Sequence, residues 1–142
     1  YGPEMRGGTS NVSVNIPDQP IGAPIIGEGD ATCVIVMNLP SLVTLESFVK
    51  PGGLLVINSS IIDKKAERKD IDVVYVAAND LANELGNPKV ANMIMLGAYL
   101  EKSKVVKPET LLDQVKAVFA KKKPELVSLN EEALKKGAAA TA

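Results

Sequence analysis

The sequence contains no histidine and only one cysteine, Cys33, among its 142 residues. Without histidine, the chain lacks the commonest general base and the commonest metal ligand. It therefore cannot by itself form a Ser-His-Asp triad or a histidine-bound zinc site. A single cysteine excludes an internal disulfide, as well as a Cys-ligated iron–sulfur cluster housed wholly in this chain. Because Cys33 lies within an apolar run, we expect it to be a small core residue.

The sequence also lacks an excess of one charge sign and a long hydrophobic run. Sixteen basic and seventeen acidic side chains leave a net charge of −1. The chain thus has no global basic field of the kind that nucleic acid or anionic lipid would require. No apolar run approaches the ~20 residues of a membrane-spanning helix, and no charged segment precedes an apolar signal-like one. These absences favour a cytoplasmic protein with no nucleic-acid or membrane partner.

Three apolar runs indicate a parallel sheet. Residues 31–37, 54–57 and 73–76 are rich in aliphatic residues without alternation, as in strands covered on both faces. A helix expected after Pro40 joins the first two runs into a βαβ unit with a right-handed crossover. We expect the run at 31–37 to be a central strand. Residues 9–16 alternate apolar and polar side chains instead, which predicts an amphipathic edge or antiparallel strand near the N-terminus.

The rest of the chain is predicted to be mostly helical. A short helix is expected to begin at Asn79 or Asp80, one of which would be its cap, and a longer one should cover residues 89–102. Two further helices are expected, one from Pro108 to before Pro124 and one over residues 126–137. The helix over 89–102 is apolar on several faces, so it should be deeply buried or pack on another subunit. Gly97 within it suggests close approach of a neighbouring backbone. The mixed charges at 63–70 predict a solvated loop, and Lys121 to Lys123 are expected to complement a helix C-terminus. The fold class is α/β, a three-layer α/β/α domain over residues 1–142 with a mostly parallel sheet and a helical C-terminus.

Polar side chains follow each predicted parallel strand. Ligands of open α/β sheets bind beyond the carboxyl ends of the strands, where this sequence places Asn38, Ser59 and Asn79. Such groups can orient a ligand, but they do not perform acid–base chemistry at neutral pH. They also favour helix caps and turns, so either role is open at this point. Asn92, an amide in the apolar helix, needs a partner if it is buried, either a neighbouring loop or a ligand.

The opening segment contains the best candidate site. Arg6 offers a planar fork for a carboxylate or phosphate, Glu4 can hold that fork, and Gly7 and Gly8 let backbone amides approach an anion. The alternative is an internal Glu4–Arg6 ion pair that only stabilises a loop. The motif is too short to identify a function without further matches.

Such matches occur along nearly the whole chain. Residues 1–11, YGPEMRGGTSN, resemble the SYGPE-[VM]-RGG segment of the gamma subunit, or gamma domain, of 2-oxoacid:ferredoxin oxidoreductases. Further similarities follow in order: PIGAP at 20–24, KPGGLL at 50–55, NSS at 58–60, ANM at 91–93, Leu96-Gly97, Leu129-Asn130, Ala133-Leu134 and Gly137. Members of this family normally begin with a strand, a GxGGQG turn and a helix before the SYGPE segment. We expect that unit to be lacking from this sequence.

The resemblance implies a role in a multi-subunit enzyme. Such enzymes oxidatively decarboxylate a 2-oxoacid on thiamine diphosphate with Mg²⁺, form an acyl-CoA from coenzyme A, and pass electrons through iron–sulfur clusters to ferredoxin or flavodoxin. The gamma component carries neither the thiamine site nor the clusters, so the isolated chain is expected to be inactive. Its partners would be alpha and beta subunits, with delta as a further candidate. The favoured substrate is 2-oxoglutarate, with branched-chain 2-oxoacids and pyruvate as alternatives.

Site residues carry over from the resemblance as well. It implies that Glu4, Arg6, Gly7 and Gly8 form a cofactor-side or interface loop, with Asn92 nearby; no catalytic or metal-ligating residue is predicted. Two other functions are open. The chain could be a stand-alone module that binds coenzyme A or a nucleotide, or a purely structural interaction subunit.

Overall fold

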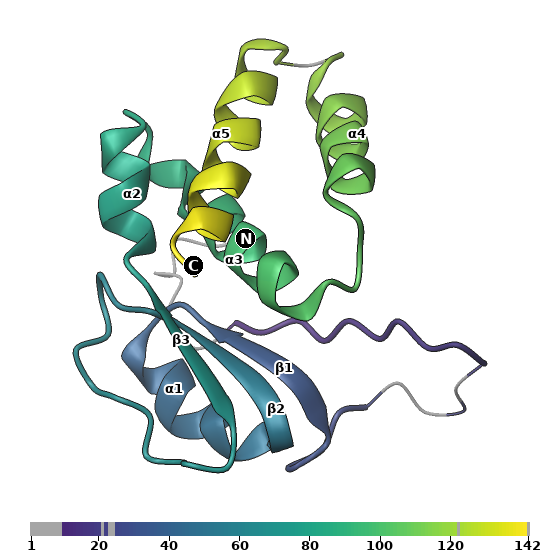
Figure 1. Cartoon of the computed structure of the whole chain (residues 1–142), viewed down its shortest axis with the longest axis vertical. Coiled ribbons are helices and arrows are strands. Elements are labelled where there is room, and N and C mark those ends of the chain that lie inside the picture. Colours follow the sequence, from purple (N-terminus) through teal and green to yellow (C-terminus); the bar gives the residue numbers. More distant parts are fainter. Residues whose placement is uncertain (1–9, 21, 23–24, 122, 142) are drawn as a thin grey trace, which may run out of the picture.

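A parallel sheet of three strands forms the centre of the molecule, with helices on both of its faces (Figure 1). The computed structural model describes residues 10–20, 22, 25–121 and 123–141. The elements in chain order are β1 (Ala31–Val36), α1 (Leu39–Leu45), the 3₁₀ turn η1 (Glu46–Phe48), β2 (Val49–Asn58), β3 (Asp72–Val76), α2 (Ala78–Glu84), the 3₁₀ turn η2 (Pro88–Val90), α3 (Ala91–Ser103), α4 (Pro108–Phe119) and α5 (Glu125–Ala139).

The strand order is β1-β2-β3, and both neighbouring pairs are parallel. The expectation that residues 31–37 form a central strand was wrong, because β2 is central and β1 lies at an edge of the described sheet. An unbroken apolar run indicates that both faces of a strand are covered, but it carries no information about the order of the strands. Only the pairing of Leu55 with Val34 and with Val73 identifies β2 as central.

β2 supplies side chains to two separate cores. Leu55 and Ile57 face α1, where they join a buried cluster that also contains Leu42. Leu54 and Val56 point to the other face and pack in the cluster built with α2, α3 and α5. Because successive side chains of a strand point to opposite faces, an uninterrupted aliphatic strand requires cover on both sides. The predicted three-layer α/β/α architecture is confirmed.

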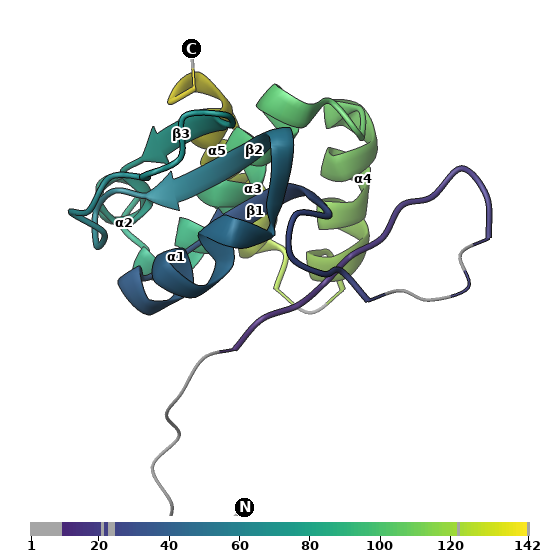
Figure 2. The same cartoon turned by 90° about the horizontal axis from the view of Figure 1, so that it is seen from below.

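Residues 10–16 do not form the strand that their alternation predicts. The described sheet consists of β1, β2 and β3, and Figures 1 and 2 show this purple segment extended outside it. Val12, Val14 and Ile16 are 85%, 70% and 68% exposed. Alternation specifies the side-chain period of a strand, whereas a stable strand also needs a neighbouring edge and a surface to cover. The described residues place neither beside this segment, so the expected strand was wrong here.

The helix α3 packs closely against α5 at two glycines. A Cβ added to Gly97 would lie 2.9 Å from the carbonyl carbon of Leu134, which is van der Waals overlap. A Cβ on Gly137 would overlap the carbonyl group of Ile94 in the same way. The predicted close approach of a backbone at Gly97 is therefore confirmed, and its partner is α5.

Burial of α3 is one-sided. Ile94, Met95 and Ala98 are buried against the sheet and α5, which confirms the predicted deep burial for this face. Asn92 and Glu101 are exposed, so the helix is not covered on all sides. No helix of the described residues is both long enough and apolar enough to cross a membrane.

The loop between β2 and β3 is held in place by charged side chains, some of its own and one, Glu46, from η1. The Glu46 carboxylate accepts hydrogen bonds from the backbone amides of Glu67 at 2.7 Å and Arg68 at 3.0 Å. The Arg68 guanidinium donates to the carbonyl oxygens of Glu46 and Val49 and pairs with Asp70 at 2.6 Å. The predicted solvated loop at residues 63–70 is present, but its charged side chains also bind it to η1 and β2.

Candidate functional site

The carboxyl ends of β2 and β3 are joined by a network of amide and hydroxyl groups. Asn58, the last residue of β2, is fully buried, and its Nδ2 donates to Oδ1 of Asn79 at 2.8 Å. Its Oδ1 accepts a hydrogen bond from the backbone amide of Ser60 at 3.3 Å. A buried amide must satisfy both its donor and its acceptor groups, and Asn58 does so between two elements. The network therefore links the end of the central strand to α2.

Ser60 provides the cap of α2 across the sheet edge. Its Oγ accepts from the backbone amide of Asp80 at 3.1 Å and lies 3.0 Å from Oδ2 of Asp80, to which it donates. The expectation that Asn79 or Asp80 caps this helix was wrong, because the helix begins at Ala78 and both residues lie in its first turn. The N-cap residue Ala77 has no side-chain acceptor, so the hydroxyl comes from a different segment.

The other polar strand exits also serve the scaffold. Oδ1 of Asn38 accepts from the backbone amide of Ser41 at 3.0 Å, which caps α1. The backbone amide of Ser59 donates to the carbonyl of Val76 at 2.8 Å, while the residue itself is exposed. For Asn38 the capping interpretation is confirmed. At this edge of the sheet, the side chains of Asn38, Asn58, Ser60 and Asn79 are already engaged in hydrogen bonds within the protein.

The residues singled out in the opening segment lie outside the described residues; they are Glu4, Arg6, Gly7 and Gly8. Asn92 is described and is exposed in the first turn of α3. Its Oδ1 accepts from the backbone amide of Met93 at 2.8 Å, so it needs no neighbouring loop as a partner. The buried amide of the helical region is instead Asn130, whose Nδ2 donates to the carbonyl of Leu126 at 2.7 Å. The sequence singled out Asn130 only as part of the Leu129-Asn130 similarity and did not predict that its amide is buried.

Cys33 packs against the core between the sheet and α3, but it is half-buried and not the enclosed core residue that was expected. Burial raises the pKa of its thiol to about 12. The thiolate is the nucleophile and the metal ligand, so this cysteine is poorly suited to either role. Within the described ranges, no group of three or more His, Cys, Asp or Glu side chains could hold a metal ion. The donor set of the chain does not fit an iron–sulfur cluster, which takes several cysteine thiolates where this sequence has one.

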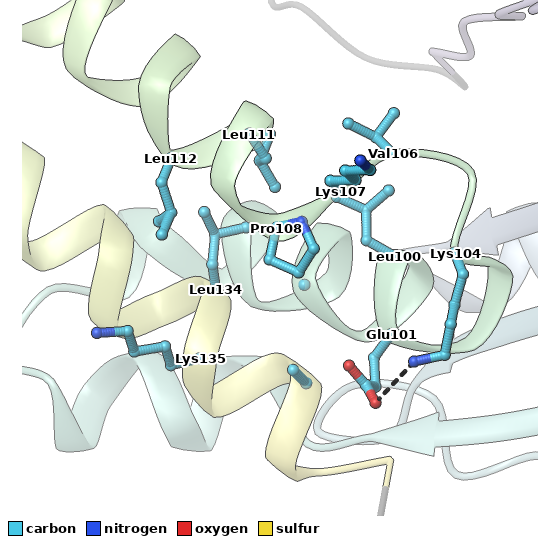
Figure 3. Close-up of a pocket in the computed structure, with 12 residues that line it drawn as sticks. Leu100, Glu101, Lys104, Val106, Lys107, Pro108, Leu111, Leu112, Leu134 and Lys135 are labelled. Carbon is cyan, nitrogen blue, oxygen red and sulfur yellow. Dashed lines mark hydrogen bonds and ion pairs between the residues drawn. The ribbon is translucent and has the colours of Figure 1, made fainter.

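An apolar groove of about 320 Å³ lies between α3, α4 and α5 (Figure 3). Its interior is formed mainly by aliphatic side chains, among them Leu100, Leu112 and Leu134. α4 packs on α5, and Figures 1 and 2 show it standing away from the sheet. The groove lies where α3 and α5 touch at their glycines and where residues 104–107 link α3 to α4. Sequence periodicity did not reveal it, since a groove depends on how helices are placed relative to one another.

Comparison with known proteins adds a family match over almost the whole chain. A family model described as pyruvate ferredoxin/flavodoxin oxidoreductase matches residues 1–140. The ketoisovalerate oxidoreductase subunit VorA of Methanothermobacter marburgensis is 29% identical over 139 residues, covering 97% of this chain and 28% of VorA. The 2-oxoglutarate synthase subunit KorC of the same organism is 31% identical over 122 residues, covering 82% of this chain and 64% of KorC. The chain thus spans less than a third of VorA and under two thirds of KorC.

Solved structures share the fold. The gamma subunit of a keto/oxoacid ferredoxin oxidoreductase from Geobacter sulfurreducens superposes with a TM-score of 0.69 at 24% identity, covering 82% of this chain and 68% of that one. The 2-oxoglutarate:ferredoxin oxidoreductase of Magnetococcus marinus gives a TM-score of 0.69 at 23% identity, over 82% of this chain and 21% of that one. These likenesses establish the α/β architecture independently of the strand and helix assignments above.

Proposed function

Because the chain belongs to the pyruvate ferredoxin/flavodoxin oxidoreductase family, we propose that it is the gamma component of a multi-subunit 2-oxoacid:acceptor oxidoreductase. That enzyme would oxidatively decarboxylate a 2-oxoacid and release an acyl-CoA. The observation that carries the proposal is the family match over residues 1–140, which spans both the described domain and the opening segment. Relatives similar over most of this chain are themselves named as subunits of such enzymes, including KorC and VorA.

The proposed role is accessory to the redox chemistry. Thiamine diphosphate, its Mg²⁺ and the iron–sulfur clusters would be held by companion subunits. For the clusters this follows from the donor set, because this chain supplies one half-buried cysteine where a cluster takes several thiolates. Companion alpha and beta subunits, and ferredoxin or flavodoxin as electron acceptor, complete the proposal. What this chain would contribute is its three-layer domain, with the opening segment as part of a site shared between subunits.

In that shared site, Arg6 would bind a carboxylate or a phosphate of coenzyme A through its planar fork, with Glu4 holding the guanidinium in place. The pair Gly7 and Gly8 would let backbone amides approach the same anion. Asn92 is a second candidate contact, because its Nδ2 has no partner within the described residues and the residue is exposed at the start of α3.

For the substrate we favour 2-oxoglutarate. The support is the similarity to KorC subunits, which are named for 2-oxoglutarate synthases and reach 31% identity. VorA, named for ketoisovalerate, is similar over a larger share of the chain, so branched-chain 2-oxoacids are the main alternative.

Reconstitution tests the function. Companion alpha and beta subunits would be produced with and without this chain, and coenzyme A-dependent reduction of ferredoxin would be measured with 2-oxoglutarate, 2-oxoisovalerate and pyruvate. The proposal expects co-purification and activity that depends on this chain. Full activity without it, together with failure to co-purify, would contradict the proposal. Binding of coenzyme A by the isolated chain in calorimetry, with no effect on the complex, would indicate a stand-alone binding module instead.

The residue assignments need a separate measurement. If Arg6 contacts coenzyme A, Arg6→Ala in the assembled enzyme raises the KM for coenzyme A or lowers kcat. Arg6→Lys should be nearly as impaired as Arg6→Ala, because lysine lacks the planar fork of the guanidinium. An unchanged KM and kcat in a stably assembled enzyme would assign Arg6 to loop structure alone.

A further inference from the structure

Gly97, which contacts the backbone of α5, is one of the residues that line the groove between α3, α4 and α5. Side chains from all three helices line the groove, with Leu100 on α3, Leu112 on α4 and Leu134 on α5 (Figure 3). None of the described residues that line it is aromatic. An aliphatic lining offers dispersion contacts along its length but no ring on which a planar ligand could stack. This surface suits a flexible hydrocarbon chain.

Positive charge borders the apolar interior. Figure 3 shows Lys107 and Lys135 on opposite sides of Pro108 and Leu134. Neither lysine forms an ion pair in the part of the chain that the structure describes. The one carboxylate in the lining, Glu101, already pairs with Lys104 at 3.3 Å. The border therefore has two ammonium groups whose charge is not compensated within the described protein.

The Lys107 end has a second source of positive potential. Lys107 is the N-cap residue of α4, and its side chain makes no capping hydrogen bond there. The first turn of a helix carries unsatisfied amides and the positive end of the helix dipole. An anionic group beside Lys107 would meet an ammonium and the amino terminus of a twelve-residue helix, whose first turn also carries the carboxylate of Glu109 and begins with Pro108, which has no amide hydrogen to donate.

From these features we infer that the groove binds an aliphatic carboxylate, with its hydrocarbon chain along the leucines and its carboxylate beside Lys107. The volume of about 320 Å³ lies at the lower end of the range of small-molecule pockets. This inference does not depend on the proposed function, because it rests only on the described helices.

The probe is sodium octanoate, titrated into the full chain while backbone amide signals are followed by NMR. Octanoate should shift the signals of groove residues such as Leu111, Leu112 and Ala138 in a saturable manner. Acetate lacks the chain and octylammonium reverses the charge, so both should bind more weakly than octanoate. Equal binding of octylammonium would overturn the assignment of an anion site, and the absence of saturable shifts with millimolar octanoate would overturn the site altogether.

Paired variants locate the binding. Ala138→Leu places a larger side chain in the groove, whereas Ala139→Leu adds the same group at an exposed position at the end of α5. We expect the first to abolish octanoate binding and the second to leave it unchanged. Octanoate binding that survives Ala138→Leu in a folded variant would overturn the inference.

The charge is tested in the same way. Lys107→Gln should weaken octanoate binding by up to about fivefold, the effect of one exposed ion pair. Lys89→Gln changes an exposed lysine in η2, which is not part of the lining, and should have no effect. Equal effects of the two substitutions would show that the attraction is not local to the groove, and would overturn the placement of the carboxylate.

Discussion

Gly97 of α3 and Gly137 of α5 each lie against a carbonyl group of the opposite helix, so the two helices meet backbone to backbone. Neither position has room for a Cβ: the one on Gly97 would approach Leu134 and the one on Gly137 would approach Ile94. This contact brings α5 onto α3 and closes the core beside β2 and β3. It also leaves α4 as the outer wall of the groove.

We predict that Gly97→Ala destabilises the fold despite alanine's helix propensity. The substitution gains about 1 kcal/mol of propensity in a helix interior. The new methyl group overlaps backbone atoms that cannot rotate away, and overpacking of this kind costs about 1–3 kcal/mol or more. The expected net loss is up to about 2 kcal/mol of unfolding free energy, measured by denaturant titration. Gly22→Ala is the control, because a Cβ there meets nothing within 4 Å; equal effects at the two sites would refute the packing argument.

The cross-sheet cap of α2 predicts a loss on Ser60→Ala. The substitution removes the hydroxyl that accepts from the backbone amide of Asp80. Loss of a helix cap costs about 1 kcal/mol, to be measured as the change in the midpoint of chemical unfolding. Ser59→Ala is the matched control, since this neighbouring serine is exposed and contributes only its backbone amide to the structure. A loss at Ser59 as large as that at Ser60 would contradict the assignment of the cap.

The Arg68–Asp70 pair predicts a pH dependence. The hydrogen bond from Arg68 lowers the pKa of the Asp70 carboxyl below its ordinary value of 3.8. A carboxyl whose pKa is lower in the folded state stabilises the fold above its unfolded pKa, and that contribution disappears as the pH falls through the folded pKa. In Arg68→Gln, the Asp70 pKa should therefore rise toward its ordinary value, as followed by NMR titration of the carboxyl carbon.

The same variant separates two functions of Arg68. Its contacts with the carbonyl groups of Glu46 and Val49 do not titrate, so their loss should be independent of pH. The stability difference between the native chain and Arg68→Gln should shrink below about pH 4 without vanishing. A difference that stays constant across this range would show that the ion pair makes no contribution.

Cys33 is predicted to be unreactive in the folded protein. Burial raises the pKa of its thiol to about 12, so very little thiolate exists at neutral pH. Labelling with a thiol-specific disulfide reagent should be slow in native conditions and fast after unfolding in denaturant. Rapid labelling of the folded chain would contradict the packing of Cys33 between the sheet and α3.

Local patterns in the sequence were sufficient where burial alone decides the structure. The aliphatic runs that became β1, β2 and β3 identified parallel strands, and the apolar composition of residues 89–102 identified a deeply buried helix. Local patterns gave wrong predictions where the structure depends on which other segment of the chain a residue contacts. Val12, Val14 and Ile16 have the period of a strand without an edge to pair with, and Asn79 has the chemistry of a cap although the cap of α2 comes from Ser60.

By itself, the sequence determined the fold class, the place of a close backbone contact at Gly97 and the family to which the chain belongs. These properties follow from side-chain size, periodicity and ordered motifs, all of which are local to the chain. The tertiary structure alone decided that β2 is central, that Ser60 caps a helix in another segment and that α3, α4 and α5 enclose a groove. Each of these depends on distances between segments far apart in sequence, which are set by the packing of the whole domain.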